Sequence, residues 1–162
     1  MLNKIKDNIW QLYFNQFGSC VYLIKLNNKN VLIDTSTLEN KEELIGNLKE
    51  LDVKLPKVDM VLLTHNHWDH IQNISLFANA KIYSYDNIEK FPVKEIKVIK
   101  TPGHTQDSLS FLYDKFLFSG DTLFNNGIGR TDFPNSSLKD MKESLEKLKK
   151  IDYKILCPGH EN

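Results

Sequence analysis

The sequence has little of several features that define whole classes of protein. Its 162 residues include two cysteines, Cys20 and Cys157, too few for a disulfide scaffold, and each lies in an apolar segment where a buried free thiol is expected. No apolar run approaches the roughly 20 residues of a membrane-spanning helix. The N-terminal stretch MLNKIKDNIW lacks the apolar core of a signal peptide. These absences predict a cytoplasmic protein that does not associate with a membrane.

The chain also lacks net charge. Its 21 basic residues balance 21 acidic ones, which argues against the global basic field typical of nucleic-acid-binding proteins. Lysine supplies the basic charge with one exception, Arg130. The hydrophobic content of 41% is that of an ordinary globular protein. A chain of this length suits one compact domain, expected to span residues 1–162.

Strand and helix patterns alternate along the chain. Segments rich in β-branched and aromatic residues predict strands, and turn residues such as those at 27–30 separate them. An alternation of this kind favours an α/β class with layered sheets. The predicted strands are residues 8–14, 19–26, 30–35, 58–64, 80–85, 96–101, 108–114, 115–120 and 154–157.

Apolar residues at helical spacing predict helices at residues 38–53 and 137–151. A short helix is also expected at HIQNISLF, residues 70–77. Ser136 or Ser137 is expected to cap the helix at 137–151. The residues predicted to form its apolar face are Leu138, Met141, Leu145 and Leu148.

Three of the five histidines occur together in HNHWDH, residues 65–70, directly after an apolar strand. Side chains two residues apart on an extended segment point the same way, so His65 and His67 can reach one metal ion. Asp69 and His70 lie beyond the turn and can reach a second ion. Imidazole nitrogens with a carboxylate suit zinc, with iron or manganese as alternatives.

The other histidines stand in similar settings. His104 in TPGHT and His160 in PGHEN each follow a Pro-Gly at a predicted strand end, and Asp121 in SGDTLF also follows a strand. The sequence therefore predicts that one sheet edge collects candidate metal ligands. The predicted ligands are His65, His67, Asp69, His70, His104, Asp121 and His160.

These motifs, in this order, resemble the metallo-β-lactamase superfamily, and the resemblance covers nearly the whole chain. It implies a four-layer αβ/βα sandwich with a dinuclear metal site between the sheet edges. It also implies how the ligands are shared. By the family pattern His65, His67 and His104 hold one divalent ion, Asp69, His70 and His160 hold the other, and Asp121 bridges them.

Within the superfamily, GDTLFNNGIGRTDFP (120–134) resembles the glyoxalase II enzymes, which hydrolyse hydroxyacylglutathione thioesters. Longer members continue beyond the last metal histidine into a helical domain, whereas two residues follow His160 here. We therefore expect no C-terminal helical substrate domain. The expected substrate is a small acyl compound or thioester, and side activities on β-lactams or lactones are left open.

Two alternatives belong to other classes of function. A metal-dependent nuclease or phosphodiesterase could use the same metal pair, although the neutral net charge disfavours it. A mononuclear iron persulfide dioxygenase is the second alternative, because GRTDF (129–133) is also similar to those enzymes. The sequence predicts no oligomeric state.

Three residues are expected to serve hydrolysis in different ways. Two divalent ions about 3.5–4 Å apart can hold a bridging water as hydroxide near neutral pH, and Asp69 is expected to relay its proton. Asp34, which closes NVLID, is expected to orient a ligand histidine; the alternative is a turn carboxylate. Arg130 is expected to anchor an anionic substrate through its planar guanidinium. The alternative for Arg130 is a salt bridge to Asp132 or Asp107.

Overall fold

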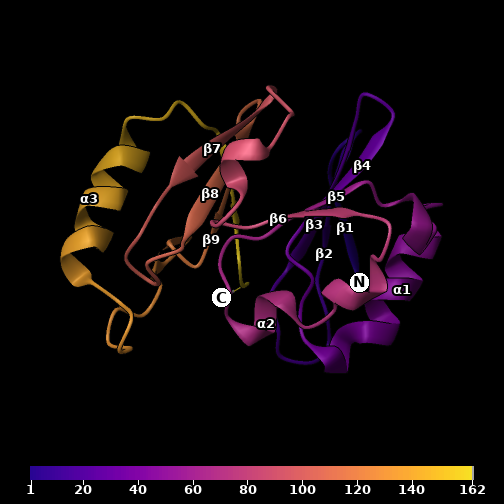
Figure 1. Cartoon of the computed structure of the whole chain (residues 1–162), viewed down its shortest axis with the longest axis horizontal. Helices are drawn as coiled ribbons and strands as arrows, with labels where there is room; N and C mark the ends of the chain where they lie inside the picture. Colours follow the sequence, from indigo (N-terminus) through magenta and orange to yellow (C-terminus); the bar gives the residue numbers. More distant parts are fainter. Residues whose placement is uncertain (162) are drawn as a thin grey trace. The chain divides into compact units, whose positions relative to one another are not determined.

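The computed structural model describes residues 1–161 and divides them into two compact units, each built on a sheet (Figure 1). The N-terminal unit comprises residues 1–63 and 67–83. The C-terminal unit comprises residues 64–66 and the chain from Ser84 onward. Across the described part of the chain, no helix is long and apolar enough to cross a membrane.

Strands β1 to β6 form the sheet of the N-terminal unit in sequence order. Neighbours from β1 to β4 are antiparallel, whereas β4, β5 and β6 run parallel. Asn27 and Asn28 make the turn between β3 and β4 with φ of 51° and 59°, as a two-residue hairpin loop requires. The strands are β1 (Leu2–Lys6), β2 (Ile9–Leu12), β3 (Val21–Leu26), β4 (Lys29–Ile33), β5 (Met60–Leu62) and β6 (Lys81–Tyr83).

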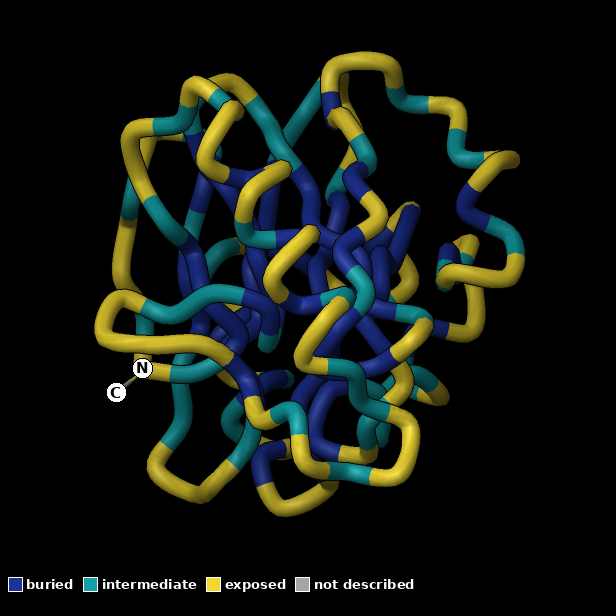
Figure 2. The backbone as a smooth tube through the Cα atoms, turned by 90° about the vertical axis from the view of Figure 1, so that its left-hand side faces the viewer, coloured by how far each residue is buried: buried dark blue, intermediate teal, exposed yellow. Residues whose placement is uncertain are grey.

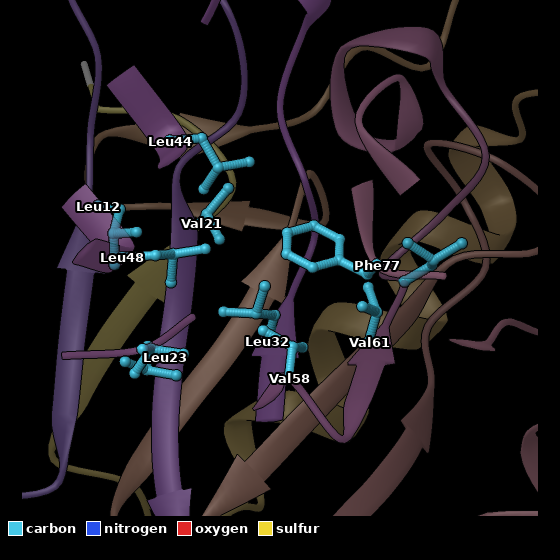
Figure 3. Close-up of a cluster of buried hydrophobic side chains, with 11 residues drawn as sticks. Leu12, Val21, Leu23, Leu32, Leu44, Leu48, Val58, Val61 and Phe77 are labelled. Atoms are coloured by element: carbon cyan, nitrogen blue, oxygen red, sulfur yellow. The ribbon is translucent and has the colours of Figure 1, made fainter. Parts of the chain in front are cut away.

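Helix α1 (Lys41–Glu50) packs against this sheet. Its Leu44 and Leu48 are fully buried and share an apolar cluster with Leu23 and Leu32 of the strands, as Figure 3 shows. Burying a side chain of this size stabilises the fold by about 1.5–3 kcal/mol relative to exposing it. The remaining helical segments of the unit are η1 (Leu38–Asn40), η2 (Leu55–Lys57), α2 (Trp68–Ile71) and η3 (Ile74–Leu76).

The sheet of the C-terminal unit has the strand order β12-β9-β8-β7. Its strands β7 to β9 are antiparallel neighbours, and β12 pairs with β9 in parallel. Strand β9 is buried along its whole length. Figure 2 colours the backbone by burial, with buried stretches in dark blue and exposed stretches in yellow. The elements are η4 (Ile88–Lys90), β7 (Ile96–Lys100), β8 (Leu109–Tyr113), β9 (Phe116–Gly120), β10 (Leu123–Phe124), β11 (Gly127–Ile128) and β12 (Ile155–Pro158).

Helix α3 (Leu138–Lys149) completes the C-terminal unit, and Leu148 packs with Ile99 and Leu117 of the sheet. The side chain of Ser137 accepts a hydrogen bond from the Asp140 N–H at 3.1 Å and caps the helix. Leu138, predicted on the apolar face, is instead 50% exposed.

Ser144 takes a place on the buried face of α3 that the sequence pattern did not predict. It is buried, and its hydroxyl donates to the Pro102 carbonyl at 2.7 Å. A polar residue can occupy the buried face because this bond satisfies its hydroxyl.

Other differences from the sequence expectations lie at the chain start and in the loops. Strand β1 was not predicted, because LNKIK is mostly polar and exposed. The β10–β11 pair was not predicted either, since it is two residues long on each side. The helix expected at 38–53 is shorter than its pattern and is preceded by the η1 turn.

We predict that Leu48→Ala lowers the free energy of unfolding by about 2–5 kcal/mol, because it leaves a cavity between α1 and the sheet. Urea denaturation measures the loss. Leu38→Ala is the matched control, because Leu38 is 54% exposed and its truncation should change stability by less than about 0.5 kcal/mol. Equal losses in the two variants would show that the cluster in Figure 3 does not stabilise the unit.

Candidate metal centre

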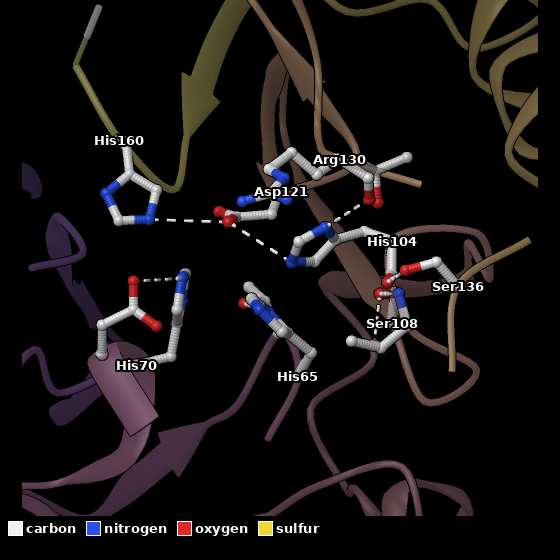
Figure 4. Close-up of polar contacts among 12 residues, drawn as sticks. His65, His70, His104, Ser108, Asp121, Arg130, Ser136 and His160 are labelled. Atoms are coloured by element: carbon white, nitrogen blue, oxygen red, sulfur yellow. Dashed lines mark hydrogen bonds and ion pairs between the residues drawn. The ribbon is translucent and has the colours of Figure 1, made fainter. Parts of the chain in front are cut away.

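In the N-terminal unit, the ends of two parallel strands bring Asp34 and His70 together. Asp34 follows β4, and its N–H donates to the Leu62 carbonyl of β5 at 2.9 Å. Its φ of 60° is left-handed, a conformation that aspartate tolerates better than most residues. Asp34 Oδ2 lies 2.8 Å from Nδ1 of His70, a contact drawn at His70 in Figure 4.

His70 is held in one orientation from both its ring and its backbone. The ring is fully buried, and the His70 carbonyl accepts bonds from the Thr35 N–H at 2.7 Å and the Thr35 hydroxyl at 3.0 Å. An ionised carboxylate can only accept hydrogen bonds, so Nδ1 carries the hydrogen that faces Asp34. In the neutral ring the lone pair therefore lies on Nε2, which is 4.0 Å from Asp69 Oδ2.

The same short segment presents His67 and Asp69 on either side of Trp68, the first residue of α2. The His67 carbonyl accepts from the His70 N–H at 3.0 Å, and the Asp69 carbonyl accepts from the Ser19 N–H at 3.1 Å. The N-terminal unit thus carries three of the predicted ligands and the residue expected to orient one of them.

In the C-terminal unit, Asp121 and His160 follow β9 and β12, which are parallel neighbours. The Gly159 N–H donates to the Gly120 carbonyl at 2.8 Å. This bond continues the pairing of β9 and β12 as far as the residues that precede Asp121 and His160. His160 Nε2 lies 3.5 Å from Asp121 Oδ2, and His104 Nε2 lies 3.6 Å from the same oxygen (Figure 4).

His104 is oriented by a backbone carbonyl. Its Nδ1 lies 2.9 Å from the carbonyl oxygen of Arg130, which can only accept, so Nδ1 carries the hydrogen. His65 meets the His104 ring edge-on, with ring centroids 4.9 Å apart and planes at 85°. The Nδ1 of His65 lies 3.1 Å from the Thr64 hydroxyl.

The contact between His104 and Asp121 fits a metal ion better than a hydrogen bond. When the His104 ring is neutral, the lone pair on its Nε2 faces a carboxylate oxygen across 3.6 Å, and neither atom carries a hydrogen to donate. A cation coordinated by both would remove the mismatch. Two ligand atoms about 2.0–2.1 Å from a tetrahedral zinc ion lie about 3.4 Å apart, close to the spacings that Asp121 makes with His104 and His160.

The donor set also suits a divalent metal. All seven predicted ligands are among the described residues that could hold an ion. They offer imidazole nitrogens and carboxylate oxygens, the donors that zinc and divalent iron accept. Oxygen atoms of the protein hold Nδ1 of His70 and His104, the arrangement that fixes tautomer and ring direction in metal sites.

Arg130 makes the local salt bridge that was the alternative to substrate anchoring. Its Nε and Nη2 donate to the two carboxylate oxygens of Asp132 at 2.9 and 2.8 Å. This pairing lowers the pKa of Asp132 below its ordinary value and raises that of Arg130. The guanidinium also lies over the Phe133 ring, 4.4 Å from its centroid. Phe133 in turn meets the His104 ring edge-on, with centroids 5.8 Å apart.

The same loop approaches Asp121 through Gly129. A Cβ on Gly129 would lie 1.8 Å from the Asp121 carbonyl oxygen and 3.0 Å from His104 Nδ1, so no other residue fits there. Sequence reasoning missed this support from Gly129 and Phe133, and also the bonds from Thr35 to His70. The glycine-rich GIGR was the one available signal for the close approach.

Comparison with known proteins identifies the family. The model of the metallo-beta-lactamase superfamily matches residues 15–86 and 85–160. A probable metallo-hydrolase of Methanocaldococcus jannaschii is 37% identical over an alignment of 144 positions, which covers 81% of this chain and 70% of that protein. A hydroxyacylglutathione hydrolase of Buchnera aphidicola is 32% identical over an alignment of 180 positions, which covers 99% of this chain and 64% of the relative. The chain therefore spans less than two thirds of the Buchnera relative's length.

Solved structures have the same fold. The crystal structure of TTHA1623 in a di-iron-bound form superposes with a TM-score of 0.78, covering 94% of this chain and 92% of that one at 21% identity. Likeness at this identity shows the fold and no more. It confirms the fold class that the motifs predicted.

We predict that Asp34→Asn weakens zinc binding about tenfold, because the amide oxygen can still accept from His70 but carries no charge. Asparagine also tolerates the left-handed backbone at this position. Competition with a chromophoric chelator measures the affinity. Asp7→Asn is the control, since the side chain of Asp7 is 97% exposed. An Asp34→Asn affinity equal to that of the control would mean that Asp34 does not support a ligand.

We predict that the main role of Arg130 is structural. Its salt bridge with Asp132 holds the loop whose carbonyl orients His104, and contact with substrate is not its main role. Arg130→Lys and Asp132→Asn should each weaken zinc binding by a similar factor, about two- to tenfold, because each loosens the loop that holds His104. Asp152→Asn removes an exposed aspartate paired with Lys115 and should change nothing. If Arg130→Lys instead leaves zinc affinity intact and raises KM for anionic substrates only, the anchoring role expected from the sequence is correct.

Proposed function

Because the chain belongs to the metallo-β-lactamase superfamily, we propose that it is a hydrolase that depends on two divalent metal ions and acts on thioesters or related acyl compounds. One observation supports the metal centre most strongly. Asp121 Oδ2 lies 3.5 and 3.6 Å from the Nε2 atoms of two histidines, spacings suited to ligands that share ions.

Each ligand assignment in the proposal follows the order of the family motifs. His65, His67 and His104 take one ion, Asp69, His70 and His160 take the other, and Asp121 serves both. Zinc is the proposed metal, since imidazole and carboxylate donors suit it. Iron remains an alternative, because a solved structure with this fold carries two irons.

The thioester substrate is inferred from the hydroxyacylglutathione hydrolase similarity, which extends over 99% of the chain. When bound, divalent ions polarise a scissile carbonyl and lower the pKa of water. Asp69 would carry the proton from the attacking water to the leaving thiolate. The bond from the Ser19 N–H to the Asp69 carbonyl fixes the backbone for this role. A thiol with a pKa of about 8.5 leaves with little help from an acid, so one carboxylate suffices for a thioester.

Asp34 and the Arg130 carbonyl have a second role in this proposal. Each keeps the Nδ1 hydrogen of a ligand histidine in place, at 2.8 Å for His70 and 2.9 Å for His104. Neither imidazole can then act as the proton carrier through Nε2 while that atom is a ligand. The proton transfer therefore falls to a carboxylate, for which Asp69 is proposed.

A substrate panel tests the proposed function. Zinc-loaded and iron-loaded protein are assayed on hydroxyacylglutathione, simple acyl thioesters, a lactone, a β-lactam and single-stranded RNA. We expect thioester hydrolysis at the highest kcat/KM, abolished by chelator and restored by zinc, while circular dichroism shows retained secondary structure. RNA cleavage without thioester hydrolysis would indicate the nuclease alternative, and oxygen consumption with a persulfide by iron-loaded protein would indicate the dioxygenase.

We predict that the metal-replete chain binds two zinc equivalents and that Asp121→Ala binds the second at least tenfold more weakly. A carboxylate between two dications offsets their mutual repulsion, and alanine does not. Elemental analysis after gel filtration gives the stoichiometry. Asp107→Ala is the matched control in the same unit. A wild-type protein that never exceeds one equivalent would contradict the paired site.

A further inference from the structure

Two aromatic side chains of the N-terminal unit, Phe17 and Trp68, are exposed and in contact with each other. Phe17 is 67% exposed and Trp68 is 54% exposed. Their ring centroids lie 5.9 Å apart with the planes tilted by 41°. Adjoining exposed apolar side chains are a common feature of ligand-binding and partner-binding surfaces.

The position of Trp68 points to substrate. It lies between His67 and Asp69, two of the proposed metal ligands, and begins the helix that carries His70. The apolar surface therefore belongs to the same segment as three of the proposed ligands, His67, Asp69 and His70. Substrate sites combine apolar walls with a few polar groups in this manner.

The loop that carries Phe17 is fixed to the same segment. The Phe17 carbonyl accepts from the Thr37 hydroxyl at 2.9 Å and from Asn40 Nδ2 at 3.1 Å. The next residue, Gly18, is packed so closely that a Cβ would lie 2.5 Å from Ser36 Oγ. Ser19 then donates its N–H to the Asp69 carbonyl. The exposed ring is therefore mounted on an ordered backbone, and binding would order little more than the side chain itself.

We propose that Phe17 and Trp68 form an aromatic platform that binds an uncharged apolar substituent of the thioester substrate. This inference rests on the proposed function and names the substrate class within it. The salt bridge of Arg130 with Asp132 is consistent with it, since the guanidinium expected to bind an anionic group already has a carboxylate partner. Substrates with alkyl or aryl groups should therefore be preferred over charged ones.

Two series of thioesters test the platform. One lengthens the acyl group from acetyl to octanoyl on a fixed thiol, and the other lengthens the thiol from ethyl to octyl on a fixed acetyl group. We expect kcat/KM to rise about two- to threefold per methylene in one series, the expected effect of partly burying each methylene. The series that rises identifies which side of the thioester lies on the platform.

Phe17→Ala and Trp68→Leu should flatten that rise, so that kcat/KM changes by less than about 1.5-fold per methylene. Their zinc content, measured in parallel, should match that of wild type. Leu138→Ala removes another exposed apolar side chain, on α3, and should keep the full rise. In a protein that hydrolyses these thioesters, a rise that persists in both aromatic variants, or no rise in either series, would overturn the platform.

A binding measurement separates this proposal from the proposed function. The fluorescence of Trp68 is titrated with 4-phenylbutanamide, which lacks a thioester, and Trp68→Phe gives the background from Trp10. If the protein hydrolyses no thioester but the Trp68 signal saturates and Phe17→Ala weakens it at least threefold, the platform stands and the thioesterase activity fails. A signal that does not saturate in wild type would overturn the platform whatever the enzyme hydrolyses.

Discussion

Each orienting hydrogen bond to a ligand imidazole decides which of its nitrogens can take a metal, and the candidate centre depends on that choice. Asp34 holds Nδ1 of His70, and the Arg130 carbonyl holds Nδ1 of His104. In both rings the lone pair is thereby assigned to Nε2. Without these bonds the rings could rotate or change tautomer, and the same residues would make a weaker site.

Backbone hydrogen bonds at strand ends fix the positions from which the functional side chains project. The bond from Asp34 to the Leu62 carbonyl joins the ends of β4 and β5, and the bond from Gly159 to the Gly120 carbonyl joins the ends of β9 and β12. In both units the strands concerned are parallel neighbours, so their carboxyl ends meet at one edge. The buried strands thus act as the rigid frame, and the functional side chains come directly after them, where loop backbone can vary without cost to the core.

Much of this architecture could be predicted from sequence because strand and ligand signals coincide. Apolar runs such as VDMVLLT end at the HNHWDH motif, and Pro-Gly pairs precede His104 and His160. What could not be predicted was contact between side chains in loops. The sequence offered Asp132 or Asp107 as partners for Arg130, and the bond to Asp132 emerged only from the loop conformation.

Short and irregular elements also could not be predicted from the sequence. The β10–β11 pair has too few residues for a pattern of alternation to emerge. The buried Ser144 is accommodated by one hydrogen bond to Pro102, which apolar periodicity cannot reveal. Nothing in the sequence pairs Phe17 with Trp68. The fold brings their segments together, with the Ser19 N–H bonded to the Asp69 carbonyl and the two rings in contact.

X-ray absorption spectroscopy at the zinc edge of the metal-replete protein tests the central claim most directly, because it reports the atoms bound to the metal. We predict nitrogen and oxygen neighbours at about 2.0–2.1 Å, with the outer-shell scattering of several imidazoles and no sulfur. A sulfur neighbour at about 2.3 Å would contradict it, since that would assign the metal to Cys20 or Cys157 rather than to the histidine and aspartate set.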